Sequence, residues 1–131
     1  MELYIGGFAQ GKLGYVKAQN PECLVFEDLE SLKNSGSSDG KSVKVLNRLH
    51  LIIKKMLLSG IEPEAIKSEI LQTVSSVSGL IIICDEIGCG IVPVDETERL
   101  YRELTGRILV EIAKKADRVV RISCGIPQAI K

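Results

Sequence analysis

The residues best suited to chemistry follow the first apolar segment of the chain, residues 1–5. Residues 6–12 fit the pattern Gly-x-x-x-x-Gly-Lys of a phosphate-binding P-loop. The glycines let backbone N–H groups turn toward phosphate oxygens, and the lysine ammonium adds positive charge. This pattern predicts a nucleotide-binding loop made of Gly6, Gly7, Phe8, Ala9, Gln10, Gly11, Lys12 and Leu13.

The residue after the lysine departs from that pattern. A P-loop carries Ser or Thr at this position, and its hydroxyl binds magnesium. This chain has Leu13, which has no oxygen to offer, and Gly14 weakens the helix that should follow. The alternative interpretation is a glycine-rich turn at the end of a strand, without a ligand.

A second group of candidates is acidic. Asp85 and Glu86 directly follow the aliphatic run 80–84, at the point where doubly wound folds bind ligands. Asp85 could hold a magnesium-bound water, and Glu86 could bind a ribose or act as a base, so both are candidate catalytic residues. Glu27, after the shorter run 23–26, is a second candidate metal ligand beside Asp85. The alternative for each of them is a solvated turn.

Other reactive side chains favour a structural interpretation. His50 lies on the edge of an apolar helical face, which is more typical of packing than of catalysis. None of the four cysteines forms a Cys-x-x-Cys pair, so we expect small buried hydrophobes rather than zinc ligands. The basic residues Arg99, Arg102 and Arg107 are expected on a solvated helix face with neighbouring glutamates.

The elements that must position these residues alternate along the chain. Apolar runs predict strands over 1–5, 23–26, 80–84 and 118–123, the last being the final strand. Apolar steps of three or four predict helices over 14–20, 43–57 and 63–77, and a capping box starts another at Asp95. Residues 34–41 have the small polar composition of a mobile loop. This alternation predicts a three-layer α/β fold with a mostly parallel sheet.

Length and charge narrow the class of protein. The 131 residues make one domain, 1–131, and 17 basic residues balance 17 acidic ones. Zero net charge and few aromatic residues disfavour a nucleic-acid partner. The longest apolar run is too short to cross a membrane, so we expect a cytoplasmic protein without a membrane span.

Taken together, these segments resemble a known family. Residues 81–93, IIICDEIGCGIVP, resemble the V-x-N-E-V-G-x-G-I-V-P signature of adenosylcobinamide kinase/adenosylcobinamide-phosphate guanylyltransferase. Residues 99–107 are similar to its R-x-F-R-D-x-x-G-R segment, and 116–119 and 125–127 to its A-D-x-V and G-I-P segments. Residues 1–12 resemble its opening strand and P-loop.

The resemblance implies a P-loop NTPase-like fold and a place in cobalamin biosynthesis. The family uses ATP or GTP and magnesium to phosphorylate and guanylylate a corrinoid side chain, and it commonly forms homotrimers. A homo-oligomer is therefore expected here. The resemblance places Glu27 where the family has its Walker B aspartate. The family's guanylylated histidine precedes that strand, so its role is not transferred to His50, and the segment that bears it is missing here.

Several residues depart from the family pattern. In the P-loop, Gln10 replaces a serine and Leu13 replaces the Ser/Thr that binds magnesium. Further along the chain, Asp85 and Leu109 each replace an asparagine. Three hypotheses follow. The chain is a compact phosphoryl and guanylyl transferase, or a degenerate paralogue that binds nucleotide or phosphate without catalysis, or a structural domain that forms oligomers.

Overall fold

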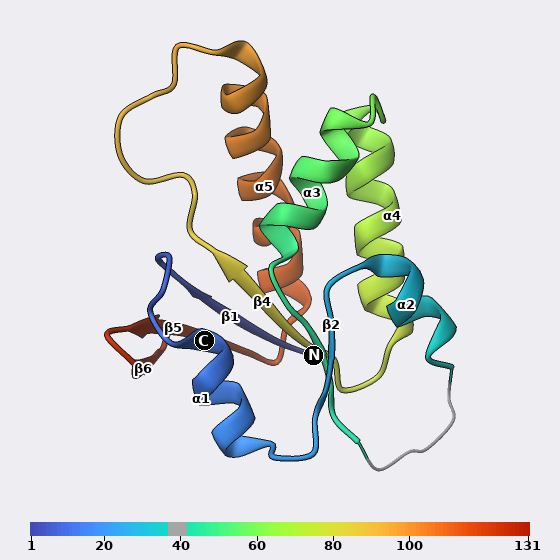
Figure 1. Ribbon diagram of the computed structural model, residues 1–131, viewed down its shortest axis with the longest axis vertical. Coiled ribbons are helices and arrows are strands. Elements are labelled where there is room, and N and C mark those ends of the chain that lie inside the picture. The colour runs from blue at the N-terminus through green and yellow to red at the C-terminus, as the bar shows by residue number, and fades with distance from the viewer. Residues whose placement is uncertain (37–41) are drawn as a thin grey trace.

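The chain alternates strands and helices in the computed structural model, which describes residues 1–36 and 42–131 (Figure 1). The strands are β1 (Glu2–Gly6), β2 (Leu24–Phe26), β3 (Lys44–Leu46), β4 (Ile81–Asp85), β5 (Arg118–Ser123) and β6 (Ile126–Ala129). The helices are α1 (Lys12–Gln19), α2 (Leu29–Asn34), α3 (Leu49–Leu58), α4 (Pro63–Ser76) and α5 (Glu96–Lys115).

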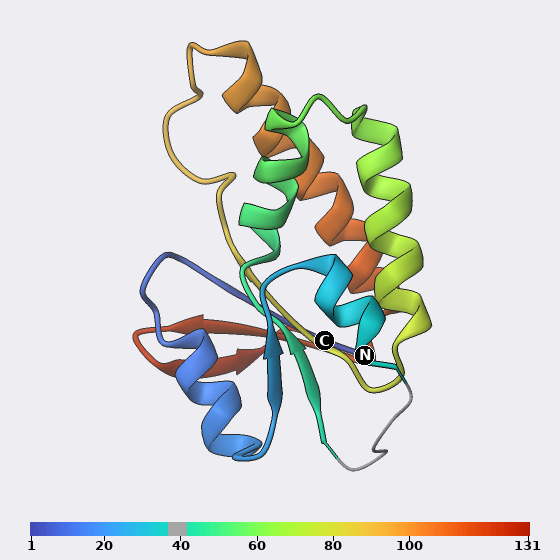
Figure 2. The same ribbon diagram turned by 45° about the vertical axis from the view of Figure 1, so that its right-hand side comes forward.

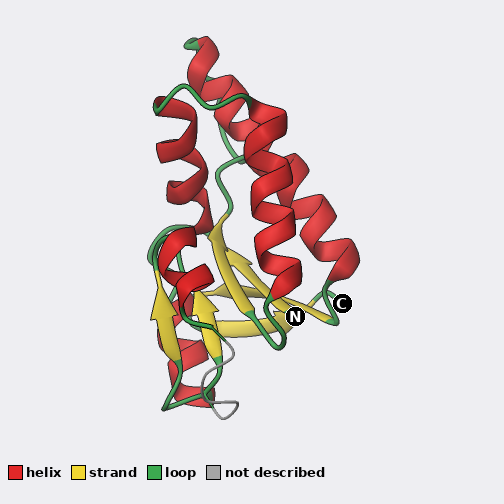
Figure 3. Ribbon diagram, turned by 90° about the vertical axis from the view of Figure 1, so that its right-hand side faces the viewer, coloured by secondary structure: helices red, strands yellow, loops and turns green. Residues whose placement is uncertain are grey.

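The strands form one sheet in the order β2-β3-β4-β1-β5-β6. All neighbouring strands run parallel except β5 and β6, which pair antiparallel. Helix α1 covers one face, and α3, α4 and α5 cover the other (Figures 2 and 3). This arrangement is the predicted α/β fold with helices on both sides of a mostly parallel sheet, consistent with a P-loop NTPase-like fold.

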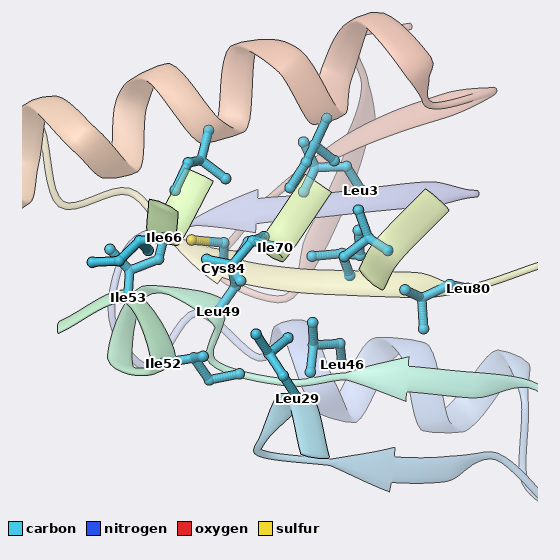
Figure 4. Close-up of a cluster of buried hydrophobic side chains, with 14 of the residues drawn as sticks. Leu3, Leu29, Leu46, Leu49, Ile52, Ile53, Ile66, Ile70, Leu80 and Cys84 are labelled. Carbon is cyan, nitrogen blue, oxygen red and sulfur yellow. The ribbon is translucent and has the colours of Figure 1, made fainter. Parts of the chain in front are cut away.

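Two apolar cores hold the layers together. The larger core packs α2 to α5 on the sheet (Figure 4) and includes Leu3, Leu46 and Ile82. The smaller one lies under α1 and includes Tyr4, Val16 and Ile83. Neighbours along β1 and β4 thus point to opposite cores, as period-2 side chains do. The aliphatic β4 lies in the middle of the sheet because both of its faces are covered.

The predicted helix over 43–57 is wrong in its first part. Residues Lys44–Leu46 form β3, and the helix begins only at Leu49. Val45 belongs to the core under α1 and Leu46 to the larger core, which is the alternation of a strand. The spacing of apolar residues imitated a helix because a strand and a helix follow one another with only two residues between them.

Two further elements were not predicted. Helix α2 occupies Leu29–Asn34, with the Asp28 side chain capping it through the Ser31 N–H. Arg118–Ser123 is not the last strand, because β6 folds back on it as a hairpin. The predicted mobile loop over 34–41 begins on the last residue of α2, and residues 37–41 lie outside the described part of the chain.

The helix expected over 14–20 begins two residues earlier, at Lys12, and ends at Gln19, whereas two other helix starts agree with the sequence. Helix α4 begins at Pro63, and α5 begins after Asp95, whose carboxylate accepts from the Thr97 N–H at 3.0 Å. Helix α5 buries one row of its apolar positions, Leu104, Ile108 and Ile112, against the sheet. None of the helices in the described residues is both long and apolar enough to span a membrane.

Candidate phosphate-binding site

The loop after β1 connects directly to the start of α1. Gly6 ends the strand, and Gly11 at the N-cap of α1 has a left-handed backbone with φ of 84°. Ala9 also has a positive φ, 54°, which is uncommon for a residue with a side chain. The first N–H groups of α1 have no acceptor within the helix, and the helix dipole makes them attractive to an anion. The predicted context of the motif, a strand before and a helix after, is therefore present.

The Lys12 side chain points back into the protein rather than out to solvent. Only 6% of Lys12 is exposed. Its ammonium donates to the Gly7 carbonyl at 2.6 Å and to the Gly6 carbonyl at 3.2 Å, and it lies 2.6 Å from Asp85 Oδ1. A lysine ammonium has three donor hydrogens, so these three acceptors can use all of them. Of the candidate residues, Lys12 and Asp85 are thus brought into direct contact.

His50 lies on the other side of Asp85. Its Nδ1 accepts a hydrogen bond from the Asp85 backbone N–H at 3.1 Å, and its Nε2 lies 3.5 Å from Asp85 Oδ2. A neutral imidazole that accepts at Nδ1 carries its proton on Nε2, which here faces the carboxylate. Burial lowers the pKa of His50, and the positive charge of Lys12 acts in the same direction, while Asp85 opposes them.

The sequence interpretation of His50 as a packing residue is thus incomplete, since the side chain is buried but contacts a candidate site residue. His50 was assigned to the middle of a helix over 43–57. With β3 in its actual place, His50 is the second residue of α3, just beyond the carboxyl end of a strand. A polar residue at that end of a parallel sheet is the signal that could have identified it.

Glu86 belongs to the same edge of the sheet but has another partner. Its backbone N–H donates to the Gly6 carbonyl at 2.9 Å. Its carboxylate accepts from Arg121 Nε at 3.2 Å and lies 3.1 Å from Arg121 Nη2. Glu86 therefore links the ends of β4 and β1 to β5, next to the loop.

The turn between β5 and β6 forms hydrogen bonds with Gln10 in the loop of residues 6–13. The Gln10 side-chain oxygen accepts from the Cys124 N–H at 2.6 Å, and the Gln10 carbonyl accepts from the Gly125 N–H at 2.9 Å. Gln10, at the family's serine position, is thus an anchor of the loop. Phe8 at the outer part of the loop is 85% exposed.

Glu27 is not brought to this loop. It follows β2 at the edge of the sheet, and β3 and β4 lie between β2 and β1. Three strand spacings amount to about 14 Å. Glu27 instead accepts from Asn47 Nδ2 at 3.0 Å and borders a cavity of about 540 Å³ beside α3. The strand nearer the loop, β3, is followed by the neutral Asn47.

The residues at the loop do not fit a magnesium ion. Leu13 supplies no oxygen, and Asp85 is already paired with Lys12. Within residues 1–36 and 42–131, no three His, Cys, Asp or Glu side chains gather as metal ligands. The assignment of Glu27 and Asp85 to a metal stays a prediction.

The glycine-rich segment after Glu86 projects from the sheet toward the start of α5 (Figure 1). Arg102 donates to the carbonyls of Gly88 and Ile91, both at 2.6 Å, and Arg99 donates to that of Val94 at 2.9 Å. These two arginines therefore support a loop rather than only a solvated face. Arg107 does pair with Glu103, as expected.

The cysteines only partly match the prediction of buried thiols. Cys84 is buried, and burial raises its pKa to about 12. Cys23 is half-buried, whereas Cys89 and Cys124 are exposed because both lie in connections rather than strands.

The comparisons with known proteins give one positive result. The model of the family described as cobinamide kinase/cobinamide phosphate guanyltransferase matches residues 20–130. No curated protein matches the chain at a significant level. The matched span covers most of the chain, including Asp85 and Glu86, but begins after α1, so the assignment of the 6–13 loop depends on its geometry. The chain belongs to the cobinamide kinase/cobinamide phosphate guanyltransferase family.

Proposed function

We propose that this chain binds the phosphates of GTP or ATP at the loop of residues 6–13 and acts in the cobinamide branch of cobalamin biosynthesis. The observation that carries the proposal is the loop itself: a left-handed Gly11 opens α1, whose first N–H groups can receive an anion. Family membership supports the choice of a nucleoside triphosphate and a corrinoid as its ligands.

In this proposal the Lys12 ammonium and the backbone of Gly6, Gly7, Phe8, Ala9, Gln10, Gly11 and Leu13 surround the phosphates. Asp85 and Glu86, at the end of the neighbouring β4, lie on the side from which an acceptor hydroxyl could approach. Asp85, which contacts Lys12, is the base in this proposal, and His50 supports it by accepting a hydrogen bond from its backbone N–H. The family's transfer reactions supply the reaction type: an acceptor oxygen of the corrinoid side chain forms a bond to a phosphorus atom of the nucleotide, the bond from that phosphorus to its bridging oxygen breaks, and a nucleoside diphosphate leaves in phosphoryl transfer or pyrophosphate in guanylyl transfer.

A second candidate function is nucleotide or phosphate binding without transfer. Leu13 favours it, because phosphoryl transfer depends on positioned positive charge and this residue removes a ligand of the metal that the family uses. We propose a homo-oligomer, as in the family, whether or not the chain catalyses transfer. The mass of the protein in solution by light scattering tests it, and a monomer at working concentration would contradict it.

Calorimetric titration of the chain with GTP and with ATP tests the proposal. We expect saturable binding that falls roughly 10- to 100-fold in Lys12→Ala, because a hydrogen bond to a charged group contributes about 1.5–3 kcal/mol. Lys17→Ala, at the last turn of the same helix, is the matched control and should bind as the unaltered chain does. The melting temperature of each variant shows whether it is folded.

Two outcomes separate the candidates. Turnover of cobinamide with GTP or ATP would support the transferase, and nucleotide binding without turnover would support the second function. If the unaltered chain bound neither nucleotide, or if Lys12→Ala bound as well as Lys17→Ala, the proposed site would be wrong.

A further inference from the structure

Lys12, the charged residue of the proposed phosphate site, already has an anionic partner within the protein. Its ammonium lies 2.6 Å from Asp85 Oδ1, and only 17% of the Asp85 side chain is exposed. The two carbonyls of Gly6 and Gly7 take up the remaining donor capacity of the ammonium. A phosphate that reaches Lys12 must therefore displace one of these acceptors or share the ammonium with it.

His50 contacts Asp85 on the side away from Lys12. The backbone N–H of Asp85 donates to His50 Nδ1, and its second carboxylate oxygen, Oδ2, faces His50 Nε2 at 3.5 Å. One carboxylate oxygen thus faces the ammonium and the other faces the imidazole. A metal ion at Asp85 would have to share these oxygens with the ammonium, whose positive charge repels it, and Leu13 offers no oxygen beside them.

We infer that Asp85 is the built-in counter-ion of Lys12 rather than a magnesium ligand, so that it competes with the phosphates for Lys12 and the loop binds them independently of magnesium. This inference rests on the proposed function, because it concerns the same loop. An incoming phosphate and the Asp85 carboxylate carry like charges, and such a juxtaposition weakens binding. If Asp85 were instead a magnesium ligand, removing its carboxylate would weaken the binding of the magnesium nucleotide.

The test is the affinity for GTP of the unaltered chain and of Asp85→Asn, each titrated with excess magnesium and with excess EDTA. Asp85→Asn keeps the size of the side chain and the backbone hydrogen bond to His50 while it removes the negative charge. We expect the unaltered chain to bind equally in both buffers. We expect Asp85→Asn to bind about tenfold more tightly in EDTA, which corresponds to about 1.4 kcal/mol.

Asp117→Asn is the matched control. Asp117 pairs with the Met1 amino group at 2.7 Å, at the opposite end of β1 from the loop. The substitution Asp117→Asn removes one negative charge from the chain, as Asp85→Asn does, so a general effect of net charge on GTP binding would appear in both variants. We expect the affinity of Asp117→Asn for GTP to equal that of the unaltered chain.

The outcomes distinguish this inference from the proposed function. Tighter binding by Asp85→Asn supports the inference, even where the unaltered chain binds too weakly to measure. Binding that requires magnesium, or that is weakened in Asp85→Asn, overturns the inference and leaves the proposed function in place. If neither protein binds GTP in either buffer, the proposed function fails and the inference fails with it. The comparison of buffers for the unaltered chain decides the magnesium question without any variant, should Asp85→Asn not fold.

Discussion

The exchange of Gly6 for alanine tests how tightly the end of β1 is packed against β5. A Cβ at Gly6 would lie 2.3 Å from the Ile122 carbonyl oxygen, which belongs to the backbone of a buried strand. Gly6 also has φ of 154°, a conformation that residues with side chains rarely adopt. Forcing extra atoms into a packed region costs typically 1–3 kcal/mol, and an unfavourable backbone adds about 1–3 kcal/mol. We expect Gly6→Ala to lose about 2–5 kcal/mol of unfolding free energy.

Gly14→Ala is the matched control, because the same methyl group is added eight positions later in an open place. A Cβ at Gly14 would meet nothing within 4 Å, and Gly14 lies inside α1. Alanine in a helix interior is more favourable than glycine by roughly 0.5–1 kcal/mol. Gly14→Ala should therefore raise the stability slightly, and the two variants should change it in opposite directions.

The assay is urea denaturation followed by circular dichroism, with the unfolding free energy taken from the linear dependence on urea. A smaller loss than about 1 kcal/mol in Gly6→Ala would refute the close approach of β1 to β5 at this point. A loss in Gly14→Ala as large as that in Gly6→Ala would refute the reasoning as a whole, since it would show that any added methyl group near the loop is harmful.

Two further predictions concern titratable side chains. With a thiol reagent at pH 8, the exposed Cys89 and Cys124 should react quickly, whereas Cys84 should react only after unfolding. The reason is that burial raises the pKa of Cys84 to about 12. Equal reaction rates for the three thiols would contradict the burial of Cys84. Burial and a hydrogen bond to Glu2 raise the pKa of Tyr4 from 10.0 to about 12. The folded state therefore favours the neutral phenol, whose stabilising contribution is complete below pH 10 and is lost between pH 10 and pH 12. Tyr4→Phe should show a shallower loss of stability over that range in urea denaturation, and an unchanged slope would exclude the effect.

Much of the fold can be predicted from the chain because most of its elements are long or aliphatic. The run 80–84 is apolar on both faces, as a central strand requires, and α5 repeats its buried apolar positions from Tyr101 to Ile112. The elements that were missed are short: β3 has three residues and α2 has six. Such segments are held by tertiary packing, as the burial of Val45 and Leu46 shows, rather than by a pattern of their own.

The candidate site could be predicted only in part, for a related reason. The loop at Gly6 and the acidic residues after β4 come from strand ends that the sequence marks clearly. The proximity of Lys12 to Asp85 follows from the pairing of β1 with β4, which no local pattern encodes. The position of His50 depends on β3, and without that strand His50 was interpreted as a packing residue within a longer helix. The distance of Glu27 from the loop could not be predicted either, because its strand follows α1 in sequence but lies at the edge of the sheet.

The charges at the loop determine which groups could contact a phosphate there. The single ammonium of Lys12 is paired with Asp85, and Leu13 supplies no oxygen for a metal ion. What remains for a phosphate is the set of backbone N–H groups at the start of α1 and whatever share of Lys12 it takes from Asp85. Backbone N–H groups bind an anion without a metal ion. In the proposed site, phosphate binding would therefore need no metal ion, whereas phosphoryl transfer would lack the extra positive charge that speeds it, and the titrations and turnover assays above test whether binding and catalysis are separated in this way.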